Sequence, residues 1–195
     1  YCPTPLMPAE LLRRVQSEIL EPTLSGLQAR NIDYCGVVYA GLIVTPEGDP
    51  KVIEFNCRFG DPEVQAVMPL LETPLDEVIL ACCEQRLESL PPLKWKAGAS
   101  ACVVMAADGY PGAYKKGLEI SGIERAEDTD TVVFHAGTRV SEGSLKSNGG
   151  RVLGVTAVAE DFEGAIAKAY SAIDKIDFPG SYYRRDIGHR VKGKA

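Results

Sequence analysis

Two β-rich runs separated by a short turn place the strongest constraint on the fold of this chain. Residues 35–44 read CGVVYAGLIV and residues 51–55 read KVIEF, and runs rich in valine, isoleucine and aromatic residues favour strands. Between them, TPEGDP supplies the proline, glycine and aspartate that turns require. The pattern therefore predicts a β-hairpin over residues 35–55.

Polar side chains gather where the second run ends, in KVIEFNCRFGDPE (51–63). Because side chains alternate between the two faces of a strand, Glu54 and Asn56 are predicted to share one face, with Arg58 if the strand continues. Carboxylate and amide oxygens suit Mg²⁺, and a guanidinium binds phosphate or carboxylate through two parallel hydrogen bonds. The opposite face, predicted to belong to the core, carries Ile53, Phe55 and Cys57.

The same stretch also has plainer interpretations. A row of alternating Glu, Asn and Arg is typical of an exposed strand face with cross-strand ion pairs. FGDPE predicts the start of a helix, with Asp61 as the N-cap, Pro62 at the first helical position and Glu63 in the first turn. Both interpretations are compatible with a metal site.

Two further features lie in the C-terminal half. SNGGRVLGV contains Gly149 and Gly150, which allow close approach of a ligand to the backbone and precede the cation Arg151. A glycine turn that begins a strand has the same pattern. His135 ends a predicted strand without a Cys, Ser or acidic partner in sequence, so we expect a structural role for it.

The whole chain predicts an α+β protein with two domains. Apolar positions recur near helical spacing in residues 8–30, where Pro22 is expected to break or kink the helix, and again in residues 75–90. LPPLKWKAG reads as a linker because its two prolines deny helix continuation, so the domains are predicted to be residues 1–93 and 98–195. The second domain is predicted to contain strands at 100–107, 131–135 and 151–159 and a helix at 162–176.

Composition and charge exclude several classes of protein. The 195 residues, 45% of them hydrophobic, can bury a core. A formal net charge of −6 argues against a nucleic-acid partner, because phosphate binding needs clustered Lys and Arg. The sequence contains no run of 18 or more apolar residues, so no membrane span is predicted. One basic group is predicted to be a solvated tail. It comprises Arg184, Arg185, His189, Arg190, Lys192 and Lys194.

The six cysteines argue against a zinc site, since they show no C-x-x-C spacing and no paired histidine. Most lie within apolar runs, where cysteine behaves as a small hydrophobic residue, so a reducing compartment is expected. They are Cys2, Cys35, Cys57, Cys82, Cys83 and Cys102.

Long motifs in both halves resemble one family. VIEFNCRFGDPEVQAVMPLL, with GVVYAGL before it, resembles the ATP-grasp core of glycinamide ribonucleotide synthetase, also called phosphoribosylamine–glycine ligase. VVMAADGYPGAY, VFHAGT, SNGGRVLGVTA and RRDIGHR resemble the C-terminal domain of the same family, in the same order. The resemblance implies the C-terminal part of an ATP-grasp lobe, an antiparallel sheet with helices, in residues 1–93. It implies the family's small α+β C-terminal domain in residues 98–195.

The resemblance also implies an activity in purine biosynthesis: ATP, glycine and 5-phosphoribosylamine give glycinamide ribonucleotide, ADP and phosphate. Family members are thought to form an acyl phosphate of glycine, which the amine of phosphoribosylamine attacks. Such chemistry needs cations around the transferring phosphoryl group.

By position, Glu54 and Asn56 match the family's Mg²⁺ or Mn²⁺ ligands, and Asn56 is also assigned to cofactor binding. Arg58 and Asp61 are assigned catalytic and substrate-binding roles. The remaining residues assigned to substrate binding are Glu63, Gly149, Gly150 and Arg151.

The family's N-terminal domain and phosphate-clamping glycine-rich loop have no counterpart in these residues. The chain is therefore predicted to be a C-terminal portion of the enzyme, inactive as a synthetase by itself. A non-catalytic remnant, a domain that completes a separate N-terminal chain, and another ATP-grasp ligase stay open as alternatives. The full-length protein is expected to be a cytoplasmic monomer that acts on small molecules, without nucleic-acid or membrane partners.

Overall fold

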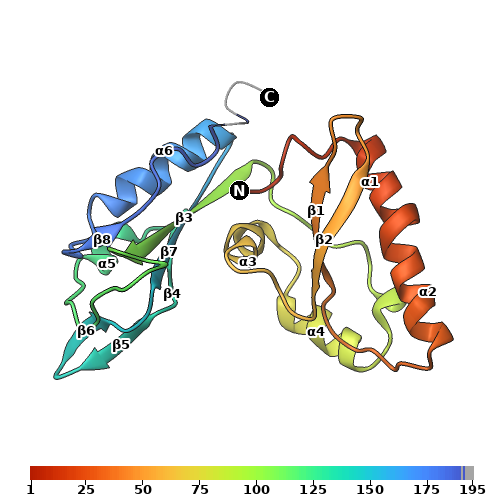
Figure 1. Cartoon of the computed structure of the whole chain (residues 1–195), viewed down its shortest axis with the longest axis horizontal. Coiled ribbons are helices and arrows are strands. Elements are labelled where there is room, and N and C mark those ends of the chain that lie inside the picture. The colour runs from red at the N-terminus through yellow and green to blue at the C-terminus, as the bar shows by residue number, and fades with distance from the viewer. Residues whose placement is uncertain (190, 192–195) are drawn as a thin grey trace. The chain divides into compact units, whose positions relative to one another are not determined.

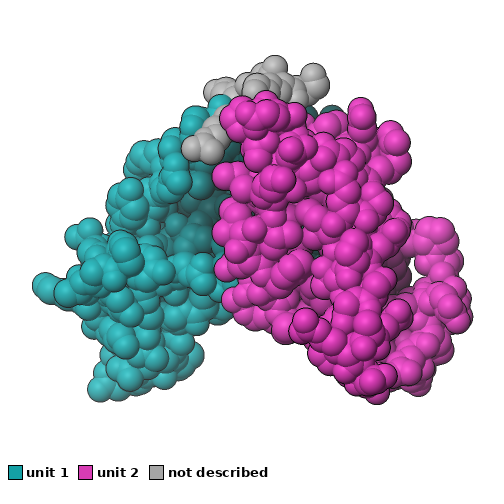
Figure 2. All heavy atoms as spheres, turned by 45° about the vertical axis from the view of Figure 1, so that its right-hand side comes forward, with its two compact units in different colours: residues 1–3, 61–70, 96–195 teal, residues 4–60, 71–95 magenta. Residues whose placement is uncertain are grey.

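The structure, a computed structural model, describes residues 1–189 and 191 and forms two compact units (Figure 2). Unit 1 comprises Tyr1–Pro3, Asp61–Leu70 and the chain from Lys96 onward, and unit 2 comprises Thr4–Gly60 and Leu71–Trp95. The chain therefore enters and leaves each unit more than once.

A long helix begins unit 2 (Figure 1). α1 (Ala9–Val15) continues through a π turn, η1 (Gln16–Leu20), into α2 (Glu21–Ala29). Pro22 distorts this helix but does not break it. Proline has no N–H to donate, and the wider turn directly before it accommodates the missing hydrogen bond. The residues of this helix that are buried are Leu11, Val15 and Ile19.

The predicted hairpin is confirmed. β1 (Tyr39–Val44) and β2 (Pro50–Asn56) pair antiparallel, and a register shift at Gly41 leaves Ile53 without a partner on the opposite strand. The prediction that Ile53, Phe55 and Cys57 belong to the core is wrong. Ile53 is 67% exposed, Phe55 is 45% exposed, and Cys57 is also exposed. Among the described residues this sheet has two strands, and so small a sheet leaves much of its apolar surface uncovered.

The helix predicted over residues 75–90 is shorter than expected. α4 (Leu75–Cys83) ends before Gln85, whose φ of 53° is left-handed, and a single 3-10 turn, η3 (Leu87–Ser89), follows. A left-handed residue after the last turn redirects the chain out of the helix.

Unit 1 is built on a four-stranded antiparallel sheet in the order β4-β7-β3-β8. Its strands are β3 (Ala99–Ala107), β4 (Thr131–His135), β7 (Arg151–Ala159) and β8 (Ser181–Tyr182). The first three confirm the predicted strands, and α6 (Phe162–Ile173) confirms the predicted helix. The elements not predicted include β8, α5 (Ile123–Ala126) and the hairpin of β5 (Thr138–Ser141) and β6 (Ser144–Ser147).

Helical layers cover both faces of the β3–β7 pair, which explains why eight of the nine β3 residues are buried. On one face α6 packs against a core that includes Val103, Met105, Leu153 and Val155. On the other, α3 (Glu63–Val67), followed by the 3-10 turn η2 (Met68–Leu70), packs on β3, and the Ser100 hydroxyl donates to the Ala66 carbonyl. Residues 61–70 are thereby fixed to the sheet.

Some predictions about surface and burial are corrected. All six cysteines are free thiols, but only Cys102 is buried; Cys2 and Cys82 are half-buried, and Cys35, Cys57 and Cys83 are exposed. In the basic tail, Arg184, Arg185 and His189 are exposed as expected. Arg190, Lys192 and Lys194 lie outside the described residues. Within residues 1–189 and 191, every helix is too short or too polar to cross a membrane.

Candidate active site

Glu54 and Asn56 lie next to each other at the end of β2, as predicted. The Asn56 Nδ2 donates to Glu54 Oε1 at 2.9 Å. Gly41 of β1 lies opposite Glu54 of β2 in the hairpin. A Cβ at Gly41 would lie 3.0 Å from the Glu54 Cγ, so glycine leaves room for the Glu54 side chain. The hydrogen bond uses the amide nitrogen, which leaves the carbonyl oxygen of Asn56 and the second carboxylate oxygen for a ligand.

This pair fits a hard divalent cation by the chemistry of its oxygens. Among the described residues, no group of three or more His, Cys, Asp or Glu side chains is placed to hold a metal ion. A site of one carboxylate and one amide matches Mg²⁺, which binds through one or two carboxylates and completes its octahedron with water and substrate phosphates.

Arg58 follows β2 in the loop of unit 2. Its NH1 donates to the Phe59 carbonyl at 2.7 Å, and the side chain is otherwise exposed. One N–H donor of the Arg58 guanidinium is therefore directed at the local backbone, and the other N–H donors can reach an anion.

Asp61 is not the N-cap of α3, which corrects the prediction. The N-cap position is Pro62 and carries no side-chain cap. The Asp61 carboxylate instead accepts from Gln65 Nε2 at 3.0 Å and from Arg151 NH2 at 2.9 Å. Arg151 NH1 also donates to the Asp61 carbonyl at 3.0 Å. Glu63 lies in the first turn of α3, as predicted.

Unit 1 therefore brings together two predicted site residues that are 90 positions apart in sequence. Arg151 begins β7, so its two hydrogen bonds fix the start of α3 to that strand. With both carboxylate oxygens engaged, Asp61 is better placed to position neighbouring groups than to accept a proton.

Gly149 and Gly150 lie close to other parts of unit 1. A Cβ at Gly149 would lie 2.9 Å from the Gly137 Cα, and a Cβ at Gly150 would lie 2.2 Å from the Tyr110 ring. Close packing explains why glycine is required at both positions. Their assignment to substrate binding stays a prediction.

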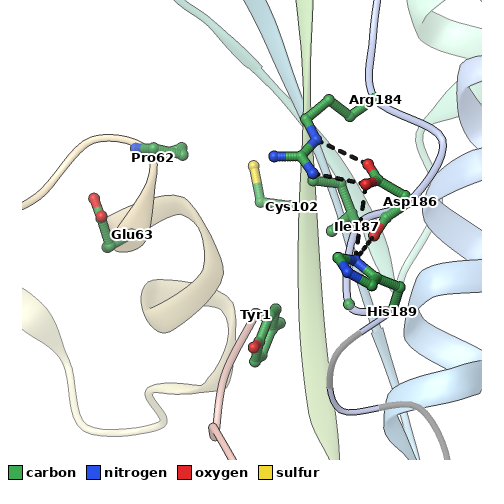
Figure 3. Close-up of a pocket in the computed structure, with 9 residues that line it drawn as sticks. Tyr1, Pro62, Glu63, Cys102, Arg184, Asp186, Ile187 and His189 are labelled. Atoms are coloured by element: carbon green, nitrogen blue, oxygen red, sulfur yellow. Dashed lines mark hydrogen bonds and ion pairs between the residues drawn. The ribbon is translucent and has the colours of Figure 1, made fainter. Parts of the chain in front are cut away.

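A cavity of about 390 Å³ in unit 1 was missed by sequence reasoning (Figure 3). Arg184 donates to Asp186 through Nε at 2.8 Å and through NH2 at 2.7 Å, and this pairing holds the pKa of the Asp186 carboxyl below its usual range. His189 Nδ1 lies 2.8 Å from the Asp186 carbonyl oxygen. Glu63 and Cys102 also line the cavity.

The sequence signal for the cavity-lining residues Arg184, Asp186 and His189 is the close spacing of Arg, Asp and His in RRDIGHR. The sequence predicts a solvated tail at those residues, because a run of charged residues alone does not distinguish a tail from a folded loop. Burial raises the pKa of the Cys102 thiol, so this residue contributes a neutral, weakly polar wall.

Two family models match the chain in succession. Residues 1–64 match the ATP-grasp (A) domain of phosphoribosylglycinamide synthetase, and residues 100–190 match the C domain of the same enzyme. This chain belongs to the phosphoribosylglycinamide synthetase family. The α+β fold and the resemblance noted from the motifs are thereby confirmed.

Individual members of the phosphoribosylglycinamide synthetase family are also similar to this chain. The phosphoribosylamine–glycine ligase of Synechocystis sp. is 58% identical over 191 residues, covering 98% of this chain and 46% of that protein. The crystal structure of phosphoribosylamine–glycine ligase from Thermotoga maritima matches 90% of this chain and 42% of its own, with a TM-score of 0.78 and 34% identity.

The fold extends beyond the phosphoribosylglycinamide synthetase family. The biotin carboxylase domain of Hydrogenobacter thermophilus 2-oxoglutarate carboxylase has a TM-score of 0.64 at 18% identity, over 93% of this chain and 39% of that domain. The chain spans less than half the length of the phosphoribosylamine–glycine ligases it matches.

Proposed function

We propose that this chain is the C-terminal portion of a phosphoribosylamine–glycine ligase, which joins glycine to 5-phosphoribosylamine at the expense of ATP in purine biosynthesis. The observation that carries the proposal is the match, in order, to the ATP-grasp and C domains of one enzyme over 98% of the chain at 58% identity. The Glu54–Asn56 pair lies within the matched ATP-grasp segment.

In this proposal Glu54 and Asn56 hold Mg²⁺ or Mn²⁺ through a carboxylate and an amide oxygen. The ion, when bound, neutralises charge on the phosphate oxygens of ATP during phosphoryl transfer. Keeping Glu54 beside Asn56 requires the hydrogen bond between their side chains and the space left by Gly41.

The other assigned residues either bind the substrates or position the residues around them. Arg58 offers its remaining donors to a carboxylate or a phosphate, where a planar fork binds with two parallel hydrogen bonds. Asp61 and Arg151 position the start of α3, and with it Glu63. Substrate contacts by Gly149 and Gly150, a monomeric full-length enzyme, and a cytoplasmic location belong to the same proposal.

The test restores the length that the enzyme requires. This chain would replace the 191 matching residues of the Synechocystis ligase, and ADP release would be measured with both glycine and 5-phosphoribosylamine present. We expect turnover that depends on both substrates. A chimaera that folds, binds ATP and forms no glycinamide ribonucleotide would favour a non-catalytic remnant.

The metal assignment is tested by Glu54→Gln in the same chimaera. This change keeps the shape and removes the charge, so kcat should fall on the order of 100-fold, or about 2.7 kcal/mol of transition-state stabilisation, and excess Mg²⁺ should restore only part of it. Glu77→Gln, on the exposed side of α4, is the matched control and should leave turnover unchanged. Normal kcat in Glu54→Gln would return Glu54 to the role of a polar strand residue.

A further inference from the structure

Four of the six cysteines gather in unit 2, around the end of α4. The Cys35 Sγ lies 3.9 Å from the Cys82 Sγ. Cys83 also interacts with the Cys35 thiol, and Cys57 interacts with the neighbouring Tyr34 hydroxyl. The proposed ligase function uses none of these thiols.

Two contacts join the segment that carries Cys35 to the end of α4. The Cys35 thiol donates to the Cys82 carbonyl at 3.3 Å, and Gln85 Nε2 donates to Asp33 Oδ1 at 3.1 Å. The Cys35 segment is therefore hydrogen-bonded to the end of α4 at the sulfur pair and at one flanking position. Disulfide bonding requires the two sulfurs to approach from 3.9 Å to about 2.05 Å.

Reagents can reach this pair. Cys35 is exposed and Cys82 is half-buried, whereas Cys102 is buried in unit 1. The hydrogen bond with Cys82 raises the pKa of the Cys35 thiol, so the thiolate of Cys35 is a minor species at neutral pH and its exchange is slow.

We propose that Cys35 and Cys82 form a reversible disulfide by exchange with a small disulfide such as oxidised glutathione. One thiolate of the pair attacks a glutathione sulfur, forms a mixed disulfide and releases one glutathione thiolate. The second protein thiolate then attacks the protein-bound sulfur and releases the other glutathione. The two cysteines together lose two electrons and two protons, and one glutathione disulfide becomes two glutathione molecules.

The cross-link would close a loop over a sequence separation of 47 residues, and this loop contains β1, β2 and the Glu54–Asn56 pair. A covalent closure of this length restricts the unfolded chain and so stabilises the folded unit. The inference does not depend on the proposed ligase activity.

The experiment is peptide mapping of the whole chain after incubation with oxidised glutathione. Thiols are blocked and the chain is digested with trypsin without reduction. Cleavage after Arg30, Lys51, Arg58 and Arg86 places Cys35 in peptide 31–51, Cys57 in peptide 52–58, and Cys82 with Cys83 in peptide 59–86. We expect one dominant linked pair, peptide 31–51 with peptide 59–86.

Variants then assign the sulfur within peptide 59–86. Cys82→Ser should abolish the dominant link, whereas Cys83→Ser and Cys57→Ser should retain it. The oxidised wild-type chain should also melt about 5 °C or more above its reduced form. Cys35→Ser should show no such difference.

Three results of the mapping would overturn the proposal. They are a link between peptides 31–51 and 59–86 that survives Cys82→Ser, a dominant link between peptides 31–51 and 52–58, and complete retention of both thiols after incubation. The same mixture of linked peptides from native chain and from chain oxidised in guanidinium would also overturn it, since pairing would then not depend on the fold. The comparison of oxidised with reduced wild type needs no variant to fold.

Discussion

Arg151→Ala should lower the free energy of unfolding of unit 1 by about 1–2 kcal/mol. The NH2 to Asp61 Oδ2 bond is an ion pair between side chains that are 41% and 45% exposed, and such pairs contribute roughly 0.2–1 kcal/mol. The NH1 bond to the Asp61 carbonyl is a separate hydrogen bond that contributes roughly 0.5–1.5 kcal/mol.

A double-mutant cycle separates these two contributions. Asp61→Ala removes the carboxylate but leaves the backbone carbonyl, so the coupling energy between Asp61→Ala and Arg151→Ala reports only the ion pair and should be about 0.5 kcal/mol. The lost bond from Gln65 to Asp61 is common to both arms of the cycle and cancels.

The assay is urea denaturation of the 195-residue chain followed by far-UV circular dichroism. Trp95 is the only tryptophan and belongs to unit 2, so its fluorescence serves as an internal reference. Arg139→Ala, an exposed arginine on β5, is the matched control and should change stability by less than about 0.5 kcal/mol.

One result would refute the reasoning. Zero coupling, with Arg151→Ala no more destabilising than Arg139→Ala, would mean that the pair is not formed in solution. Arg151 would then be available to a substrate anion, and its positioning role would be withdrawn.

Three further predictions concern charge, packing and burial. Arg184 lowers the pKa of Asp186, so the ionised carboxylate stabilises the folded chain above its unfolded pKa of about 3.9. This contribution is lost as the pH falls through the lowered pKa of the folded state. Between pH 7 and pH 2.5 the melting temperature of wild type should therefore decrease more steeply than that of Asp186→Asn. Gly150→Ala should lower the free energy of unfolding by roughly 1–3 kcal/mol, because the added Cβ would overlap the Tyr110 ring. In thermal melts, part of the lost melting temperature should be recovered when Tyr110→Ala is added. Leu153→Ala should cost roughly 2–5 kcal/mol in urea titrations because Leu153 is 1% exposed, whereas Ile53→Ala, at 67% exposed, should cost far less; equal losses would contradict the burial assigned to the two strands.

The elements that sequence reasoning predicted well are those in which local pattern and packing agree. The hairpin around TPEGDP and the strand that becomes β7 carry β-branched runs bounded by turn residues, so their positions could be read directly. The side-chain alternation that joined Glu54 to Asn56 also follows from strand geometry alone.

The errors arose where tertiary surroundings decide the outcome. Alternation predicted a buried face at Ile53 and Phe55, but burial depends on whether another layer covers the strand, which a local pattern does not contain. Asp61 has the residue type of an N-cap, yet its carboxylate binds Arg151, a partner 90 positions away that no short-range rule identifies. Cys35 and Cys82 are joined in the same long-range way.

The interleaved path of the chain through its two units limits where genes of this family can recombine. α3 packs on β3, and the Ser100 hydroxyl donates a hydrogen bond to the Ala66 carbonyl. Residues 71–95, which belong to unit 2, separate α3 from β3 in sequence. A crossover near residue 95 would therefore join α3 from one parent to a sheet from the other. Unit 1 would inherit a mismatched seam in its own core, although residue 95 lies in what the sequence presents as a linker.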